Sequence, residues 1–272
     1  MASKPQQRTS QESLLWLPAE HDRDTLRRAL VEAGVAGVNS HDRPNVLWKI
    51  RRLCEGDPDS QFGMSRVSGR PPEEVLRLVA DRSGIDPDPG VHHGMVIVDP
   101  EKVLEGFEAV AERLRLAATR GERVLLATGH PQGLPVLYGE TGRLLVHHGA
   151  KLIRPLEGFE WRDHLGRRRR ILYRDDVAML TDGTTGLHTH GSEAMERMLT
   201  EERPDLVFGD HGMAGAAIEA GIDTVAIADV NDPALVVAHE QGRAVAVAVM
   251  DDNVDPEDYW PCFQVIASRF RD

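Results

Sequence analysis

Acidic side chains and histidines recur directly after short apolar runs of this sequence. The apolar runs and the polar segments that follow them are Val124–Ala127 before Thr128–Pro131, Val177–Leu180 before Thr181–Gly183, Leu206–Phe208 before Gly209–Gly212, Val225–Ala228 before Asp229–Asp232, and Val245–Met250 before Asp251–Asn253. In an open parallel sheet, ligands bind outside the carboxyl ends of the strands. A single Asp or Asn at such a place is often only the cap of the next helix, but five coincident strand ends predict one shared site.

Carboxylates and imidazoles together favour a divalent ion such as Mg²⁺, Mn²⁺ or Zn²⁺. The candidate metal ligands are Asp182, Asp210, His211, Asp229, Asp232 and Asp252. Little side-chain bulk keeps a ligand away from Asp210 and His211, because a glycine stands on either side of the pair. The candidate catalytic residues are His130, Asp210 and His211: His211 can act as ligand or as general base, and His130 can protonate a leaving oxygen.

Three segments are candidates for binding a phosphate. The turn from Thr128 to Gly133 lies between a strand and a helix, where backbone N–H groups can face an anion. It has neither the Gly-Lys-Ser/Thr of a Walker loop nor the Gly-x-Gly-x-x-Gly of a dinucleotide site. His188 and His190, two residues apart, share one face if the segment is extended, although an exposed loop with incidental histidines is the alternative. The predicted phosphate-binding residues are Thr128, Gly129, Gly133, Arg51, His188 and His190.

The elements that position these residues alternate between apolar strands and amphipathic helices. This pattern predicts an α/β fold, a Rossmann-like, doubly wound and mostly parallel sheet. A closed eight-fold barrel is disfavoured, because only five or six short strand–helix units are visible. Helical patterns with a turn-rich boundary at residues 86–90 precede the sheet. The predicted organisation is a disordered tail (1–12), a helical N-terminal arm or cap (13–90) and an α/β catalytic core (91–272).

Composition narrows the class of protein. The 272 residues carry 32 Lys and Arg against 44 Asp and Glu, a net charge of −12, which argues against a nucleic-acid partner. The longest apolar run is far too short to span a bilayer, the first residues are polar rather than a secretory signal, and Cys54 and Cys262 form no metal or disulfide motif. We therefore expect a cytoplasmic protein that binds a small molecule, does not contact a membrane and can form a homodimer.

Several long motifs together resemble those of a family of actinobacterial phosphatases. They are Ala127-Thr-Gly-His-Pro-x-Gly-Leu134, Leu180-Thr-Asp-Gly183, His188-Thr-His190, Asp210-His-Gly-x-Ala-Gly-Ala-Ala-Ile-Glu-Ala-Gly-Ile-Asp-Thr-Val225 and Ala228-Asp-Val-Asn-Asp-Pro-Ala234. The resemblance covers nearly the whole chain and implies hydrolysis of phosphomonoesters. Val98-Asp99-Pro100 has no second Asp and so does not form the Asp-x-Asp signature of haloacid-dehalogenase phosphatases. The Cys-x5-Arg loop of cysteine phosphatases and the Arg-His-Gly of histidine phosphatases are also missing, so none of their covalent intermediates is predicted.

Three functions fit these residues. The first is a metal-dependent phosphatase acting on a small phosphorylated metabolite, a nucleotide or a sugar phosphate, in which the ion polarises the phosphoryl group. The second is a transferase that uses a nucleotide or phosphosugar donor on the same sheet, with Asp229 on a ribose hydroxyl. The third is a non-catalytic metabolite-binding protein. Metal-dependent release of phosphate separates the first function from the other two.

Overall fold

A computed structural model describes residues 15–271 and places a mostly parallel sheet at the centre of the molecule. The predicted tail over residues 1–12 lies outside the described residues. Five parallel strands, in the order β10-β9-β8-β3-β7, continue into the antiparallel strands β6 and β5, and β4 pairs with β3. The strands are β3 (Arg123–Thr128), β4 (Lys151–Leu152), β5 (Glu160–Arg162), β6 (Arg168–Arg174), β7 (Val177–Thr181), β8 (Leu206–Asp210), β9 (Thr224–Ala228) and β10 (Ala246–Val249).

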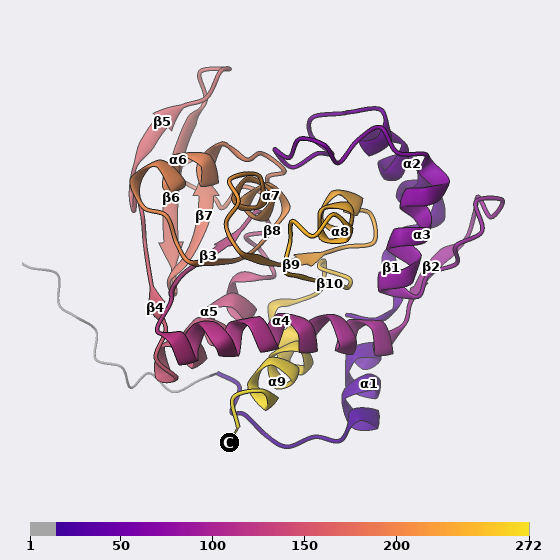
Figure 1. Ribbon diagram of the computed structural model, residues 1–272, viewed down its shortest axis with the longest axis horizontal. Helices are drawn as coiled ribbons and strands as arrows, with labels where there is room; N and C mark the ends of the chain where they lie inside the picture. Colours follow the sequence, from indigo (N-terminus) through magenta and orange to yellow (C-terminus); the bar gives the residue numbers. More distant parts are fainter. Residues whose placement is uncertain (1–14, 272) are drawn as a thin grey trace, which may run out of the picture.

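Helices cover both faces of this sheet, which confirms the predicted α/β doubly wound fold. In Figure 1, α6, α7 and α8 lie above the sheet, and α4, α5 and α9 lie below it. Their bounds are α4 (Pro100–Arg120), α5 (Pro135–His147), α6 (Glu193–Glu201), α7 (His211–Glu219), α8 (Pro233–Glu240) and α9 (Trp260–Ser268), with a short 3-10 helix η1 (Pro256–Tyr259). Among the described residues, none of the helices combines the length and apolar composition needed to cross a bilayer.

The order of the strands fixes where a ligand can bind. β3 pairs with β7 on one side and with β8 on the other, so the chain reverses its direction of winding between β3 and β8. Such a switch point opens a crevice at the carboxyl ends of the two strands. These ends carry Gly129 and His130 after β3, and Asp210 and His211 at the end of β8. The topology therefore directs the site to residues that the sequence had singled out.

Helix α4 illustrates how the local sequence defines an element. The side chain of Asp99 accepts a hydrogen bond from the N–H of Glu101 at the start of the helix, and Pro100 occupies the first turn, where its missing N–H costs nothing. Gly121 ends the helix with φ 66°, in the left-handed region that glycine adopts most easily. One face of the helix is buried and is formed by Val103, Leu104, Phe107, Val110 and Leu114.

The residues before the sheet are only partly helical. This region contains the helices α1 (Arg23–Glu32), α2 (Arg43–Cys54) and α3 (Pro72–Ser83). It also contains β1 (Gly37–Asp42), which pairs with β2 (Met95–Val98) in an antiparallel ribbon that the sequence did not predict. Apolar side chains of this region belong to the same buried cluster as those of the sheet and α4. Helix α3 packs on α8, and α1 packs on α4. The division at residues 86–90 stays a prediction, while the packing is continuous across it.

Candidate active site

A cavity of about 280 Å³ lies at the carboxyl ends of β3, β8, β9 and β10. Its lining consists of imidazole, amide, carboxyl and ammonium groups. The residues are His41, Asn45, Lys49, His130, His188, His190, His211, Asn231, Asp232, Asp252 and Asn253. Six of them are residues that the sequence had predicted for the site: His130, His188, His190, His211, Asp232 and Asp252. The structure thus brings together side chains that are far apart in the sequence.

Asp210 and His211 form a pair at the switch point. The carboxylate of Asp210 is fully buried, and its Oδ1 accepts the N–H of Gly129 at 2.7 Å and lies 2.7 Å from His211 Nδ1. His211 has φ 45°, a left-handed conformation that is uncommon outside glycine. Its other nitrogen, Nε2, lies 3.4 Å from Asp232 Oδ2 and 3.9 Å from Asp252 Oδ2. Asp210 therefore stands behind His211 and orients it, so its predicted role as a metal ligand is not supported by its position.

The dense packing of acids and imidazoles shifts the pKa values of these side chains. Burial disfavours the charge on His211, but Asp232, Asp210 and Asp252 outweigh it and raise the pKa of this imidazole to about 10. Burial and the neighbouring carboxylates raise the pKa of Asp252 to about 8, although His211 opposes the shift. At the cavity mouth, loss of hydration and three nearby imidazoles lower the pKa of His188 to about 4.

Among residues 15–271, several buried carboxylate oxygens have no hydrogen-bond donor within that part of the chain. They are Asp210 Oδ2, Asp229 Oδ2 and Asp252 Oδ2. A buried carboxylate without a partner is costly, and a cation removes that cost. Two groups of side chains have ligand atoms within 4.8 Å of one another, namely His211 with Asp232 and Asp252, and His188 with His190 and His211. All three residues of the first group are buried. The arrangement has the donor chemistry of a divalent-ion site.

Strand β1 brings a set of side chains that the sequence did not reveal. Asn39 Nδ2 donates to Asp229 Oδ1 at 2.9 Å, and His41 Nε2 lies 3.5 Å from Asp229 Oδ2. The backbone N–H and hydroxyl of Ser40 both donate to the carboxylate of Asp251. Asp229, predicted as a metal ligand, is thus held by β1 outside the cavity lining. These contacts were invisible because no motif links β1 to residues about two hundred positions later.

Helix α2 contributes Asn45 and Lys49 to the cavity, which are four residues apart and share one face of the helix. The predicted phosphate ligand Arg51 is exposed and does not line the cavity. Arg51 lies about 200° around the helix from Lys49, because each residue of an α-helix turns by roughly 100°. The basic residue that this helix places in the cavity is therefore Lys49 and not the predicted Arg51.

The segment carrying His188 and His190 packs directly on two glycines. A Cβ on Gly129 would lie 2.4 Å from Thr189 O, and a Cβ on Gly212 would lie 2.3 Å from His190 O. Both distances are closer than any side chain permits, so these positions require glycine. The ring of His190 lies 5.1 Å from that of His211, and the ring of His188 lies 4.9 Å from that of His130. The glycines thus allow four imidazoles to form one wall.

The loop after β3 does not offer its first two N–H groups to a phosphate. The N–H of Gly129 donates to Asp210 and that of His130 donates to Thr128 Oγ1. Gly133 lies against Tyr259 and Val254, where a Cβ would be 3.1 Å from the Tyr259 hydroxyl. These contacts show that Thr128, Gly129 and Gly133 stabilise the loop and its packing. Their geometry therefore does not support the predicted role in phosphate binding.

Asp182 also lies outside the cavity lining. Its carboxylate accepts hydrogen bonds from the N–H groups of Thr184 and Thr185 and from the Thr184 hydroxyl. These bonds lower the pKa of Asp182 to about 2. They are those of a residue that stabilises a turn, and the structure does not place Asp182 with the other candidate ligands.

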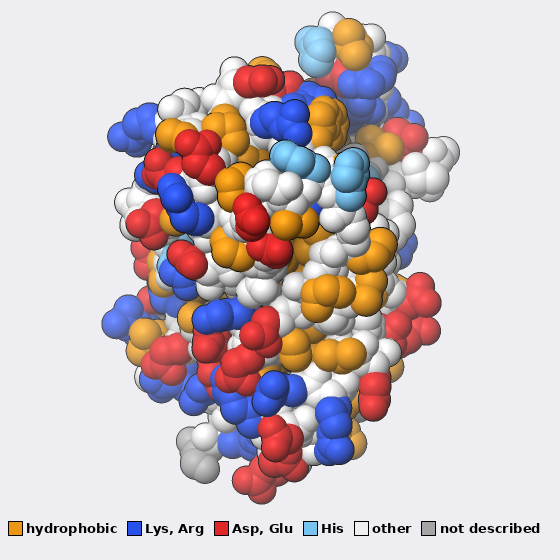
Figure 2. All heavy atoms as spheres, turned by 90° about the vertical axis from the view of Figure 1, so that its right-hand side faces the viewer, with side chains coloured by type: hydrophobic (Ala, Val, Ile, Leu, Met, Phe, Trp, Pro, Cys, Tyr) orange, Lys and Arg blue, Asp and Glu red, His pale blue; other side chains and the backbone are white. Residues whose placement is uncertain are grey.

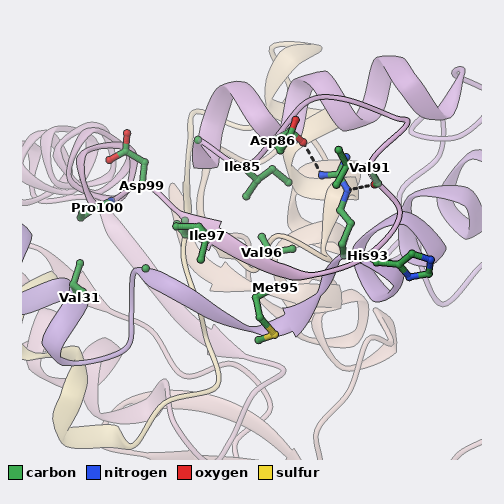
Figure 3. A pocket seen from close by; sticks show the side chains of 14 residues that line it. Val31, Ile85, Asp86, Val91, His93, Met95, Val96, Ile97, Asp99 and Pro100 are labelled. Atoms are coloured by element: carbon green, nitrogen blue, oxygen red, sulfur yellow. Dashed lines mark hydrogen bonds between the residues drawn. The ribbon is translucent and has the colours of Figure 1, made fainter.

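A larger cavity of about 610 Å³ lies beside the β1–β2 ribbon. Figure 3 shows Ile85, Val96 and Ile97 around it, and Arg43 holds the adjoining loop by hydrogen bonds to backbone oxygens of Asp86 and Val91. Figure 2 looks at this side of the molecule and shows hydrophobic side chains gathered among charged ones. The lining is mainly apolar, so the chemistry of the protein is expected in the smaller, polar cavity.

Comparison with known proteins agrees with this geometry and with the resemblance seen in the sequence. The model of the family described as Phosphatase matches residues 21–271. A Streptomyces coelicolor protein named Phosphatase SCO2771 is 36% identical over 253 residues, which cover 90% of this chain and 94% of that protein. The match extends over the N-terminal helices, the ribbon and the sheet alike. The chain belongs to the Phosphatase family and is a phosphatase.

Proposed function

We propose that the protein hydrolyses a phosphomonoester of a small metabolite with the help of a divalent metal ion bound in the polar cavity. One observation carries this proposal. Asp252 Oδ2 is buried without a hydrogen-bond donor, in a group with His211 and Asp232 whose ligand atoms lie within 4.8 Å of one another. A divalent cation satisfies such a group, and phosphate esters need positive charge at their oxygens during hydrolysis.

His211 Nε2, Asp232 and Asp252 are the residues that would hold the ion. The hydrogen bond from His211 Nδ1 to Asp210 fixes the orientation of the ring, as a carboxylate behind a metal-binding histidine commonly does. A bound ion would neutralise charge on the phosphoryl oxygens and favour ionisation of the attacking water. Asp229 and Asp251 accept hydrogen bonds from β1 and contribute by fixing the shape of the site.

Other side chains of the cavity bind the phosphate and move protons. Lys49 lines the cavity, forms no ion pair with any carboxylate of residues 15–271, and has its ammonium group 5.8 Å from the centre of the Trp48 ring. We propose that this ammonium group binds the phosphoryl oxygens. His188 and His190 extend the same wall. His130 Nδ1 is buried without a partner and is the proposed proton donor to the leaving oxygen.

The reaction balances with water as the only co-substrate. The water oxygen forms a bond to phosphorus, the ester P–O bond breaks, and the leaving oxygen takes a proton from His130. The proton released by the attacking water returns to an imidazole of the wall, so the products are an alcohol and inorganic phosphate. Family membership favours this hydrolysis over the transferase and the non-catalytic binding protein that the sequence alone left open.

Phosphate release measured with and without a chelator tests the proposal. We expect chelation to abolish release from small phosphomonoesters and added Mg²⁺, Mn²⁺ or Zn²⁺ to restore it. Asp252→Asn should weaken metal binding, measured by calorimetry, in parallel with turnover. Full activity in excess chelator, or unchanged metal affinity in Asp252→Asn, would contradict the metal-dependent mechanism.

A further inference from the structure

We propose that the substrate is the phosphate ester of a small polyhydroxylated alcohol, a sugar or polyol phosphate rather than a nucleotide. We further propose that the paired amides of Asn45 and Asn231 bind one of its hydroxyl groups. The inference rests on the proposed hydrolysis in the same cavity and goes beyond it, because it assigns the part of the substrate that leaves as the alcohol.

The amide pair has a hydrogen-bonding pattern that matches a hydroxyl group. Asn231 Nδ2 donates to Asn45 Oδ1 at 3.0 Å. This bond leaves Asn45 Nδ2 as a donor and Asn231 Oδ1 as an acceptor, and neither atom has another partner among residues 15–271. Reversing both amides leaves the same pattern, one free donor and one free acceptor. A hydroxyl group both accepts and donates, so it satisfies the two atoms at once.

The amide pair also lies on the proposed substrate side of the cavity. Asn45 is one helical turn before Lys49, the proposed phosphate ligand, and both side chains line the cavity from α2. Asn253 adds a third amide from the loop after β10. A phosphate beside Lys49 would therefore leave its alcohol among amide groups, which suit hydroxyls and offer little to a hydrocarbon chain.

The cavity lining lacks the large aromatic rings on which nucleobases stack best, and its imidazoles pack on one another. None of its lining residues is Phe, Tyr or Trp, and the buried ring of Phe62 lies behind His190 and His211. Trp48 on α2 is exposed but lies outside the lining, and the Arg52 guanidinium sits 4.8 Å from the centre of its ring. A volume of about 280 Å³ is also at the lower limit of ligand pockets.

Matched esters test the substrate class in the metal-loaded protein. We would compare kcat/KM for ribose 5-phosphate with pentyl phosphate, for glycerol 1-phosphate with propyl phosphate, and for ribose 5-phosphate with adenosine 5′-monophosphate. We expect each hydroxylated ester to exceed its alkyl partner by about tenfold or more, as one or two hydrogen bonds provide, and the nucleotide to be the poorer ribose ester. Equal rates within the alkyl pairs, or a faster nucleotide, would overturn the inference and leave the proposed hydrolysis standing. Absence of phosphate release from every ester with every ion would overturn both.

Two variants test the role of the amide pair. Asn45→Leu keeps the size of the side chain and removes the amide, so the preference for hydroxylated over alkyl esters should fall about tenfold, mainly through KM. Arg51→Leu changes the same helix outside the cavity and should keep the preference of the native protein. An unchanged preference in Asn45→Leu would show that this pair does not bind the substrate hydroxyl.

Discussion

At the scale of single residues, the decisive contact is the one between Asp210 and His211. Asp210→Asn keeps the shape of the side chain but removes the charge that holds Nδ1 of His211, so Nε2 should be poorly presented to a metal ion. We expect metal affinity to fall about 10–100-fold, the range seen when the partner of a metal-binding histidine is lost. Calorimetric metal titration would measure this, and Asp182→Asn, at a strand end outside the cavity, should bind metal as the native protein does. Equal affinity in both variants would refute the orienting role of Asp210.

Lys49 gives a second prediction at this scale. Lys49→Met retains the hydrocarbon part of the side chain and removes its charge. Charge-assisted hydrogen bonds contribute about 1.5–3 kcal/mol, so KM for a phosphomonoester should rise roughly 10–100-fold. Steady-state kinetics with Arg51→Met as the control would show the difference between the two positions. A comparable effect in both variants would mean that charge near the cavity matters and the position of Lys49 does not.

The sequence predicted the residues at the strand ends better than those that surround them. His130, His211, Asp232 and Asp252 follow or end apolar runs, and this position alone placed them at one edge of the sheet. His41 and Lys49 lie outside the central sheet and reach the cavity through the tertiary packing of β1 and α2. No local pattern encodes such packing, which explains why they were missed.

At the scale of secondary-structure elements, the segment from His188 to His190 lies so close to the loop after β3 that Gly129 cannot be replaced by a larger residue without strain. Gly129→Ala would place a Cβ 2.4 Å from Thr189 O. Overpacking of this kind costs about 1–3 kcal/mol, and here the strain falls on His188 and His190, so both stability and kcat/KM should decrease. Gly106→Ala is a matched control, because its Cβ would lie 2.8 Å from Ala248 Cα in β10, away from the cavity.

Thermal unfolding and kinetics of the two variants separate their effects. We expect Gly106→Ala to lower the melting temperature while the folded protein keeps its kcat/KM. Loss of activity in Gly106→Ala at temperatures where it is folded would contradict the localisation of the site.

The elements themselves followed from the sequence where their signals were local. Helix α4 has a capping Asp99, a proline in its first turn and a terminal glycine, all of which are signals in the local sequence. The ribbon β1–β2 was not predicted, because its pairing joins residues more than fifty positions apart and its strands are short. Asp210 was predicted just after a strand and is its last residue, a difference within the usual variation of strand ends.

At the scale of the whole molecule, we expect the buried carboxylates of the site to make the stability of the protein depend on a bound cation. Asp210, Asp229, Asp232, Asp251 and Asp252 are all buried. An ion at 100 times its dissociation constant adds about 2.7 kcal/mol to the free energy of unfolding, which corresponds to a rise of several degrees in melting temperature for a chain of this size. Thermal unfolding with added metal would measure the rise, and Asp252→Asn should show much less of it. No rise in the native protein would argue against a metal at these residues.

The contact between Ser40 and Asp251 joins residues 211 positions apart. The ribosome must therefore have released Asp251 before β1 can meet the loop after β10, and a nascent chain that lacks Asp251 cannot form this contact. Closing so long a loop is also slow compared with forming a helix. A fragment that ends before Asp251 would carry His130 and His211 without this contact between β1 and the loop after β10, so we expect it to lack a complete site.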